Sequence, residues 1–188
     1  MKHALLIAFV AASALTTPAF AECPPPQDVS AELQALIAKA QGAKNYQEGR
    51  GVSGEMWRVY LRAPDETAQA ALDEGLRRRD AYDFAGALTE FNRLAEYCPT
   101  FAEGFNQRAY IHFLRGEHEK ALPDLDKALE LSPHHVAAQS GRALTLMNLG
   151  RIEEARAQML IAVENNPWLS EAALLADGAP LGLKGDEI

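Results

Sequence analysis

The chain is short of basic residues, of cysteine and of long apolar runs. Its 188 residues include 18 Lys and Arg against 26 Asp and Glu, which gives a formal net charge of −8. An acidic surface repels phosphate backbones and anionic lipid headgroups, so nucleic acid is an unfavourable partner. After residue 21 no apolar stretch approaches the ~20 residues that a transmembrane helix needs. We therefore expect no nucleic-acid partner and no stable membrane insertion of that part.

The cluster Arg77-Arg78-Arg79 is interpreted as a solvated helix end, with a local anion site as the alternative.

The first 21 residues have the pattern of a secretory signal peptide. Lys2 precedes an apolar run from Ala4 to Ala14, and Ala19-Phe20-Ala21 is a small-x-small cleavage site. Cleavage after Ala21 is predicted; an uncleaved anchor is the alternative. Removal of residues 1–21 takes away one base and no acid, so the basic count falls from 18 to 17 and the net charge from −8 to −9.

Cysteine occurs only twice, at Cys23 and Cys98. Two cysteines in an exported chain can form one disulfide. Such a bond would close a loop of about 75 residues and contribute at most roughly 4 kcal/mol through the entropy of the unfolded chain. Two free thiols are the alternative.

Motifs for catalysis and metal binding are also missing. The sequence has neither Gly-x-Ser-x-Gly nor His-Glu-x-x-His. The four histidines after residue 21 (His112, His118, His134 and His135) do not have a spacing that brings three ligands onto one zinc ion. Residues 42–54 contain four glycines and are predicted to form a loop, but they lack the Gly-Lys-Ser/Thr ending of a phosphate-binding loop. We therefore expect no cofactor, no metal and no enzyme activity; a small enzyme or cofactor-binding protein using this loop is the alternative.

A 34-residue spacing dominates the rest of the chain. The residues that recur with it are Pro99, Pro133 and Pro167; Ala87, Ala121 and Ala155; Phe91, Leu125 and Met159; and Leu94, Ala128 and Ala162. Gly116 and Gly150 mark the same turn in two copies. A period of about 34 residues is that of a helix–turn–helix repeat. Since each unit buries its apolar face only by stacking on a neighbour, the sequence predicts an all-α solenoid with an extended surface.

Apolar periodicity places the elements. The predicted helices are residues 30–41, 66–80, 84–97, 101–114, 118–131, 135–148 and 152–165, with a short helix between Met56 and Leu61. The predicted organisation is a proline-rich extended segment at 22–29, a degenerate N-terminal helical pair at 30–64, and a solenoid at 65–177 with repeats at about 68–101, 102–135 and 136–169. A capping helix over 168–177, with Trp168 on the last apolar face, and a mobile tail over 178–188 complete it.

Across residues 68–169, and more weakly from residue 30, the chain resembles the tetratricopeptide repeat proteins. Beyond the residues at 34-residue spacing, the resemblance rests on Phe105 and on small residues at the helix crossing: Gly75, Ala109 and Ala143. It departs from the pattern at Arg108 and Arg142, where leucine is usual, and at Gln139, where an aromatic is usual. The resemblance implies a right-handed superhelix whose first helices line a concave groove for a peptide or partner protein. Because the chain is expected to be exported and contains the segments RAPDETAQAALDEG and CPTFAEGFNQRA, it is similar to periplasmic members of the family from Gram-negative bacteria.

The family register gives the partner-binding positions. They are Gln69, Leu72, Leu76, Arg79, Glu103, Asn106, Tyr110, Phe113, Ala137, Ser140, Leu144 and Met147. The lysine and asparagine clamp by which some members hold a terminal carboxylate is not reproduced. The groove is rather apolar, so either it docks a partner or the chain's own N-terminal helix covers it. The predicted function is a non-enzymatic scaffold of the cell envelope; a structural element that dimerises through the Trp168 end is a further alternative.

Overall fold

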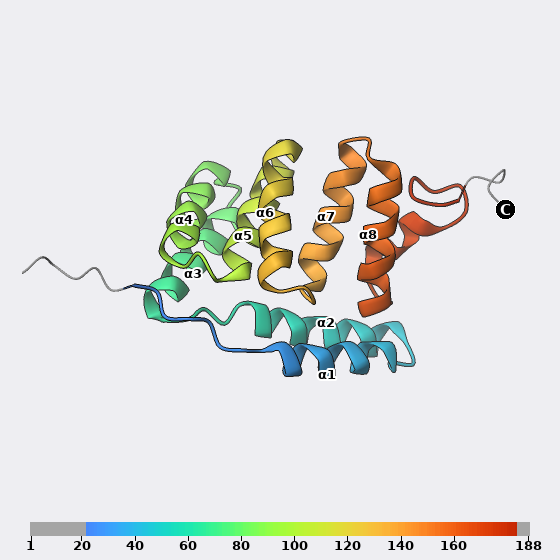
Figure 1. The fold of residues 1–188 in the computed structure, drawn as a ribbon, viewed down its shortest axis with the longest axis horizontal. Helices are drawn as coiled ribbons and strands as arrows, with labels where there is room; N and C mark the ends of the chain where they lie inside the picture. Colours follow the sequence, from blue (N-terminus) through green and yellow to red (C-terminus); the bar gives the residue numbers. More distant parts are fainter. Residues whose placement is uncertain (1–21, 184–188) are drawn as a thin grey trace, which may run out of the picture.

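The computed structural model describes residues 22–183, and the regular structure within that range is entirely helical (Figure 1). Three antiparallel helix pairs stack side by side. Their helices are α3 (Glu66–Asp80), α4 (Phe84–Tyr97), α5 (Ala102–Leu114), α6 (His118–Leu131), α7 (Val136–Asn148) and α8 (Ile152–Asn165). The predicted all-α solenoid is confirmed. In residues 22–183 no helix combines the length and apolarity needed to cross a membrane. The predicted signal peptide at 1–21 lies outside the described residues.

The 34-residue pattern is a packing pattern. Its alanines Ala87, Ala121 and Ala155 are fully buried where the two helices of each pair cross. Gly75 serves the same purpose on α3, because a Cβ there would overlap the ring of Phe91. Large and small side chains therefore interlock from one helix to the next, as close-packed interiors require.

The turns inside the helix pairs need a left-handed backbone. Gly116 and Gly150 have φ angles of 72° and 75° at the 34-residue spacing. In the first pair the same place is held by Tyr82, with φ 61° and 82% of its surface exposed. Glycine adopts this conformation without the Cβ penalty that other residues bear, so Tyr82 is the strained copy of the turn.

The N-terminal region differs from its prediction. Residues 30–60 form a hairpin of α1 (Ser30–Gln41) and α2 (Tyr46–Tyr60), which we call the N-terminal hairpin. The loop predicted at 42–54 is wrong: helix α2 begins at Tyr46, and the Asn45 side chain caps it by accepting from the Glu48 N–H at 3.0 Å. Gly49, Gly51 and Gly54 lie inside this helix, and Gly42 is the C-cap residue of α1, so the predicted glycine-rich loop is a short turn followed by a helix.

The N-terminal hairpin does not stack on α3 as a first repeat would. It runs beneath the lower ends of α5 to α8 (Figure 1), and its apolar face packs on Val136 and Trp168. The indole Nε1 of Trp168 donates to the carbonyl of Ala40 at 2.8 Å. Trp168 is therefore half-buried and packs on the hairpin as well as following the last repeat.

The C-terminal segment covers the last repeat in a different way from that predicted. In place of a helix over 168–177 there is a 3-10 helix, η1 (Ser170–Leu175). The chain then turns back so that Leu181 is fully buried in the core of the last repeat, and Arg156 donates to the Leu181 carbonyl at 2.9 Å. The prediction of a mobile tail from residue 178 is therefore wrong for residues 178–182, because Leu181 completes this core.

A disulfide fastens the start of the described chain. Cys23 is bonded to Cys98 at the end of α4, as predicted, with 5.2 Å between the Cα atoms. Residues 22–29, which we call the strap, have no regular secondary structure and lead from this bond to α1 (Figure 1). The disulfide thereby ties the N-terminal hairpin to the first repeat.

Candidate binding groove

A groove lies between α2 and the first helices of the three repeats. Its main cavity has a volume of about 460 Å³. Its lining residues, which define the concave groove, are Trp57, Arg79, Asp80, Asn106, Gln107, Tyr110, Ala137, Ser140, Gly141, Leu144 and Glu171. A second cavity of about 340 Å³ shares Trp57 and Ser140 with it and continues between α2 and α7 towards Trp168. The N-terminal hairpin thus forms one wall of the groove and leaves its interior hollow.

Six of the predicted positions line this cavity, and one more lines a neighbouring recess. Those in the concave groove are Arg79, Asn106, Tyr110, Ala137, Ser140 and Leu144. Phe113 lines a small apolar recess of about 50 Å³ that it shares with Asn106, Tyr110 and Leu144. The register of the resemblance therefore locates the floor of the groove on α5 and α7.

The other predicted positions lie elsewhere. Leu72 is fully buried in the core between α3 and α4, and Glu103 is 1% exposed inside a hydrogen-bond network. Leu76 and Met147 pack against the cores of the first and last repeats. The Gln69 side chain accepts from the Ala63 N–H at 3.1 Å. These five do not line the groove because the repeat cores and the helix ends occupy their side chains.

Five residues of the groove were missed from the sequence: Trp57, Asp80, Gln107, Gly141 and Glu171. Asp80, Gln107 and Gly141 each directly follow a predicted position in the sequence, so they could have been found by including the neighbours of those positions. Trp57 and Glu171 come from α2 and η1, outside the repeats. Only the fold-back of the two chain ends brings them to the groove.

Two aromatic side chains line the groove, one on its wall and one on its floor. Trp57 of α2 and Tyr110 of α5 are 39% and 45% exposed. The Arg79 guanidinium lies 5.8 Å from the centroid of the Tyr110 ring, within the range of a cation–π contact. Large amphipathic rings of this kind are the usual anchors of protein interfaces.

The three arginines at the end of α3 are paired within the chain. Arg77 and Arg78 both donate to Glu74, and their hydrogen bonds lower the pKa of that carboxyl to about 2. Arg79 pairs with Asp80 at 2.8 Å. The cluster is therefore a compensated helix end, and the alternative of an anion site has no support from the geometry.

A polar network crosses the floor of the groove. Arg79 donates to Gln107 at 2.9 Å, and Gln107 donates to Glu103 at 2.6 Å. On the other side of Glu103 lies His135, at 2.7 Å, whose ring stacks on that of Tyr60 at 3.8 Å between centroids. Burial raises the pKa of the Tyr60 phenol. The network links α3, α5, α7 and α2 and fixes the wall against the floor.

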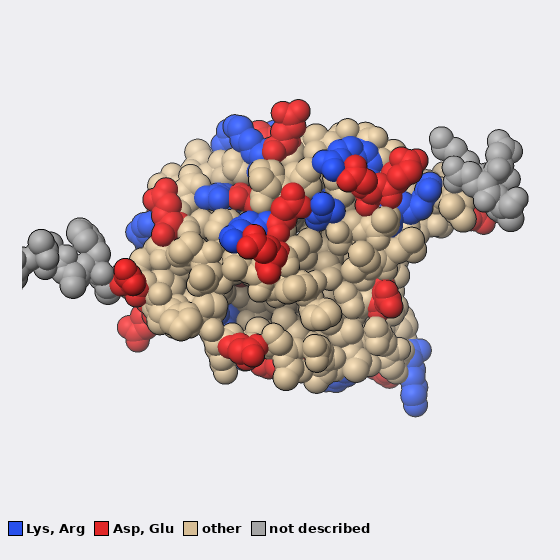
Figure 2. Space-filling view, viewed as in Figure 1, with Lys and Arg blue, Asp and Glu red and all other residues tan. Residues whose placement is uncertain are grey.

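The departures from the family pattern, Arg108 and Arg142, form a second set of bridges away from the groove. Arg108 binds Asp124 of α6 through two nitrogens, at 2.6 and 2.7 Å, and also contacts Asn92 of α4. Arg142 bonds to Asp126 of α6. Figure 2 shows charges of both signs interspersed on the face that carries α4, α6 and α8. This face is neutralised locally and offers no single-sign patch.

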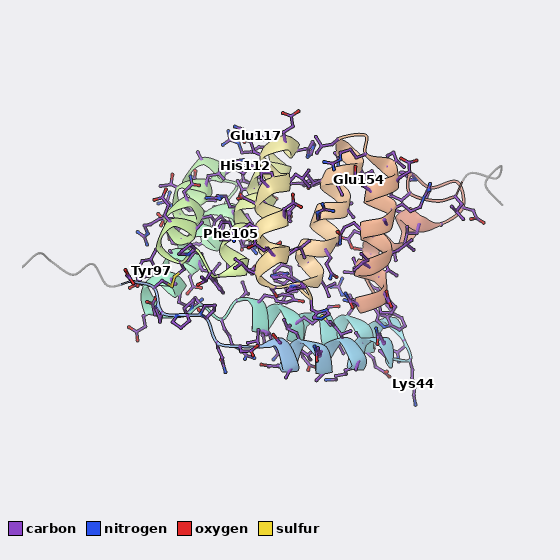
Figure 3. The ribbon with its side chains drawn as sticks, in the orientation of Figure 1. Lys44, Tyr97, Phe105, His112, Glu117 and Glu154 are labelled. Atoms are coloured by element: carbon purple, nitrogen blue, oxygen red, sulfur yellow. A yellow bond between two sulfur atoms is a disulfide. The ribbon has the colours of Figure 1, made fainter. Side chains whose placement is uncertain are left out.

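His112, one of the four histidines considered as zinc ligands, forms a pair with a carboxylate. At the turn between α5 and α6, His112 and Glu117 point towards each other with 2.7 Å between nitrogen and oxygen (Figure 3). Within residues 22–183 no group of three His, Cys, Asp or Glu side chains is placed to hold a metal ion. The concave groove, with its cavity of about 460 Å³, has room for part of a peptide segment.

Comparison with known proteins agrees with this architecture. The tetratricopeptide repeat profile matches residues 102–135, which hold α5 and α6. The chain is 45% identical over 65 residues to a tetratricopeptide repeat protein 36 homolog from Nematostella vectensis, covering 35% of this chain and 36% of that protein. It is 38% identical over 52 residues to a TPR repeat-containing protein from Rhizobium etli, covering 28% and 26%. A DnaJ homolog subfamily C member 3 from Bos taurus is 29% identical over 100 residues, covering 53% and 20%.

The matches therefore span between a fifth and about a third of these relatives' lengths. They support the description of the chain as a tetratricopeptide repeat protein. Residues 102–135 carry the matched repeat, and the pairs before and after it continue its 34-residue spacing.

Proposed function

We propose that the protein is a non-catalytic interaction module that holds a segment of a partner protein in the concave groove. The observation that carries this proposal is the pair Trp57 and Tyr110, two partly exposed aromatic rings on the wall and the floor of one cavity of about 460 Å³. Rigid aromatic side chains at the centre of a hollow supply most of the energy of a typical interface. The repeats and the tetratricopeptide repeat relatives support a role in protein–protein interaction.

The test places a photo-reactive phenylalanine at Tyr110 and, as a matched control, at Tyr82 on the turn between α3 and α4. Each variant is irradiated in native envelope extract, and the adducts are identified by mass spectrometry. The proposal expects a protein adduct from position 110 that is absent from position 82 and that is lost when Trp57→Ala is added. The same adducts from both positions, or adducts insensitive to Trp57→Ala, would contradict it.

The proposed place of action is the cell envelope, specifically the periplasm of a Gram-negative bacterium. This rests on the signal-peptide pattern of residues 1–21 and is supported by the Cys23–Cys98 disulfide, which suits an oxidising compartment. The check is the N-terminal sequence of the protein isolated from cells. We expect it to begin at Glu22 with no thiol open to alkylation. Protein that keeps residues 1–21 and has two free thiols would contradict the proposed location.

A further inference from the structure

Another cavity, separate from the concave groove and from its continuation between α2 and α7, lies under the strap. Its volume is about 210 Å³. It is bounded by residues 26–30 of the strap and the start of α1, by the end of α2, and by the segments that precede α5 and α7. We call it the strap pocket. Figure 2 shows the surface hollowed between the N-terminal hairpin and the repeats above it.

A buried carboxylate, Glu103, forms part of the wall of the strap pocket. Its side chain is 1% exposed and accepts three hydrogen bonds: from Gln107 at 2.6 Å, from Asn106 at 3.1 Å and from His135 at 2.7 Å. Two of the donors are uncharged amides. The charge of the third depends on the protonation of the imidazole.

The backbone decides that protonation. The N–H of Ala138 donates to Nδ1 of His135 at 3.2 Å, in the capping position of α7. A nitrogen that accepts a hydrogen bond carries no proton, so the proton lies on Nε2 and the ring is neutral. Within residues 22–183 no lysine or arginine forms an ion pair with Glu103, and Arg79 reaches only Gln107. A buried carboxylate without a cation is costly, and a positive charge brought close to it is stabilised.

Asp28, which also lines the strap pocket, adds a second negative charge. The carboxylate of Asp28 accepts from the Ser30 N–H at 2.9 Å, and this hydrogen bond lowers its pKa, so it is ionised at neutral pH. The one arginine of the lining, Arg62, gives two nitrogens to Glu32 at 2.6 and 2.7 Å, which compensates its charge. The pocket therefore has an excess of negative charge, whereas Leu33, Val59 and Phe101 give it an apolar wall.

We propose that the strap pocket binds an organic cation: an ammonium or guanidinium group carried on a short alkyl chain. The apolar wall suits the alkyl part, and the carboxylates of Asp28 and Glu103 attract the charged end. A free amine and a lysine or arginine side chain of another protein share this chemistry. This proposal does not depend on the concave groove, since the strap pocket has its own lining.

The test is calorimetric titration of the oxidised protein with three probes at low ionic strength. Agmatine represents a free cation, Nα-acetyl-lysine amide represents a protein side chain, and Nα-acetyl-norleucine amide is the uncharged match. We expect that at least one cation binds and that the norleucine compound does not. Added salt should weaken the binding of the cation, because it screens the attraction between charges. Tighter binding of agmatine assigns a free amine, and tighter binding of the lysine compound assigns a protein side chain. Binding of neither cation, or equal binding of the norleucine compound, would overturn the proposal.

Two variants locate the cation. Asp28→Asn keeps an oxygen that accepts from Ser30 and removes only the charge, so we expect affinity to fall about two- to fivefold, as for a partly exposed ion pair. Glu153→Gln removes an exposed charge on α8 and should leave affinity unchanged. An unaltered affinity in Asp28→Asn, or an equal loss in Glu153→Gln, would contradict binding at this pocket.

The nitrogen chemical shifts of His135 provide a check that needs no variant. A neutral ring with its proton on Nε2 supports the argument, because Glu103 then lacks a cation of its own. A doubly protonated ring at neutral pH would overturn it, since the imidazolium would already supply the positive charge.

Discussion

The repeats α3–α8 and the N-terminal hairpin α1–α2 are both made of amphipathic helix pairs, but contacts of different range hold them. Within the repeats each helix packs on the next along the chain, through side chains that recur every 34 residues. The hairpin is anchored by hydrogen bonds such as Val136 to Tyr60, Asn166 to Ser53 and Trp168 to Ala40, between residues 76 to 128 positions apart. A regular period therefore builds the floor of the groove, and non-periodic contacts build its wall.

This difference bears on the groove directly. Its floor belongs to the most regular part of the molecule, whereas Trp57 belongs to the hairpin. Local stability follows the number and burial of such contacts, so the wall can respond to changes that leave the floor intact. The predictions below separate the two regions.

The largest effect is expected from the repeat core. Phe91 is fully buried against Gly75, and Phe91→Ala should lower the free energy of unfolding by about 3–5 kcal/mol, because it removes apolar contacts and leaves a cavity. Chemical denaturation followed by circular dichroism measures this loss. Hydrogen exchange should rise across α3 and α4. A loss below about 1 kcal/mol would mean that the 34-residue pattern is not the main source of stability.

The disulfide comes next. Cys23→Ser releases the strap, and we expect a loss of about 2–4 kcal/mol, typical for a bond that closes a long loop. The loss should concentrate in the hairpin: hydrogen exchange of α1 and α2 increases more than that of α5 to α8. Equal increases in both regions would show that the hairpin and the repeats unfold as one unit.

The 34-residue spacing explains why the repeats could be predicted from the sequence and the N-terminal hairpin only in part. The helices of the repeats were placed within a residue of their observed bounds, because apolar spacing and proline positions reflect contacts between neighbours in the chain. The short helix predicted between Met56 and Leu61 is the end of α2. The preceding part of α2 was missed because Gly49, Gly51 and Gly54 are poor helix formers, and only tertiary contacts override that preference.

For the groove, the family register found the positions on α5 and α7 but could not supply Trp57, whose place depends on the fold-back of the hairpin. The same limit applied to Trp168. Its apolar character was evident from the sequence, but whether it covers the last repeat or the hairpin depends on contacts more than 100 residues away. Burial of Glu103 was equally invisible, since a charged residue on a first helix is ordinarily expected to face solvent.

Two glycines of α2 test the hairpin contact as a matched pair. A Cβ at Gly49 would overlap the indole of Trp168, whereas one at Gly51 meets nothing within 4 Å. Gly49→Ala should therefore cost about 1–3 kcal/mol through overpacking, and should blue- or red-shift the tryptophan emission as the indole moves. Gly51→Ala should stabilise the helix by up to about 1 kcal/mol. Thermal unfolding of the two variants gives the comparison, and stabilisation by both would show that Trp168 does not pack on α2 in solution.

The smallest effect is expected at the strained turn of the first repeat. Tyr82 bears the left-handed conformation that glycine holds in the other two copies, and its side chain is exposed apart from an edge contact with Phe84. Tyr82→Gly removes about 1 kcal/mol of backbone strain but adds roughly 0.5–1 kcal/mol of unfolded-chain entropy, so the net gain should be below about 0.5 kcal/mol. The reverse change, Gly116→Ala, introduces the strain and should destabilise by about 1 kcal/mol. Denaturation midpoints of the two variants should therefore move in opposite directions. A clear loss in Tyr82→Gly would mean that the exposed ring stabilises the first repeat by more than the turn costs.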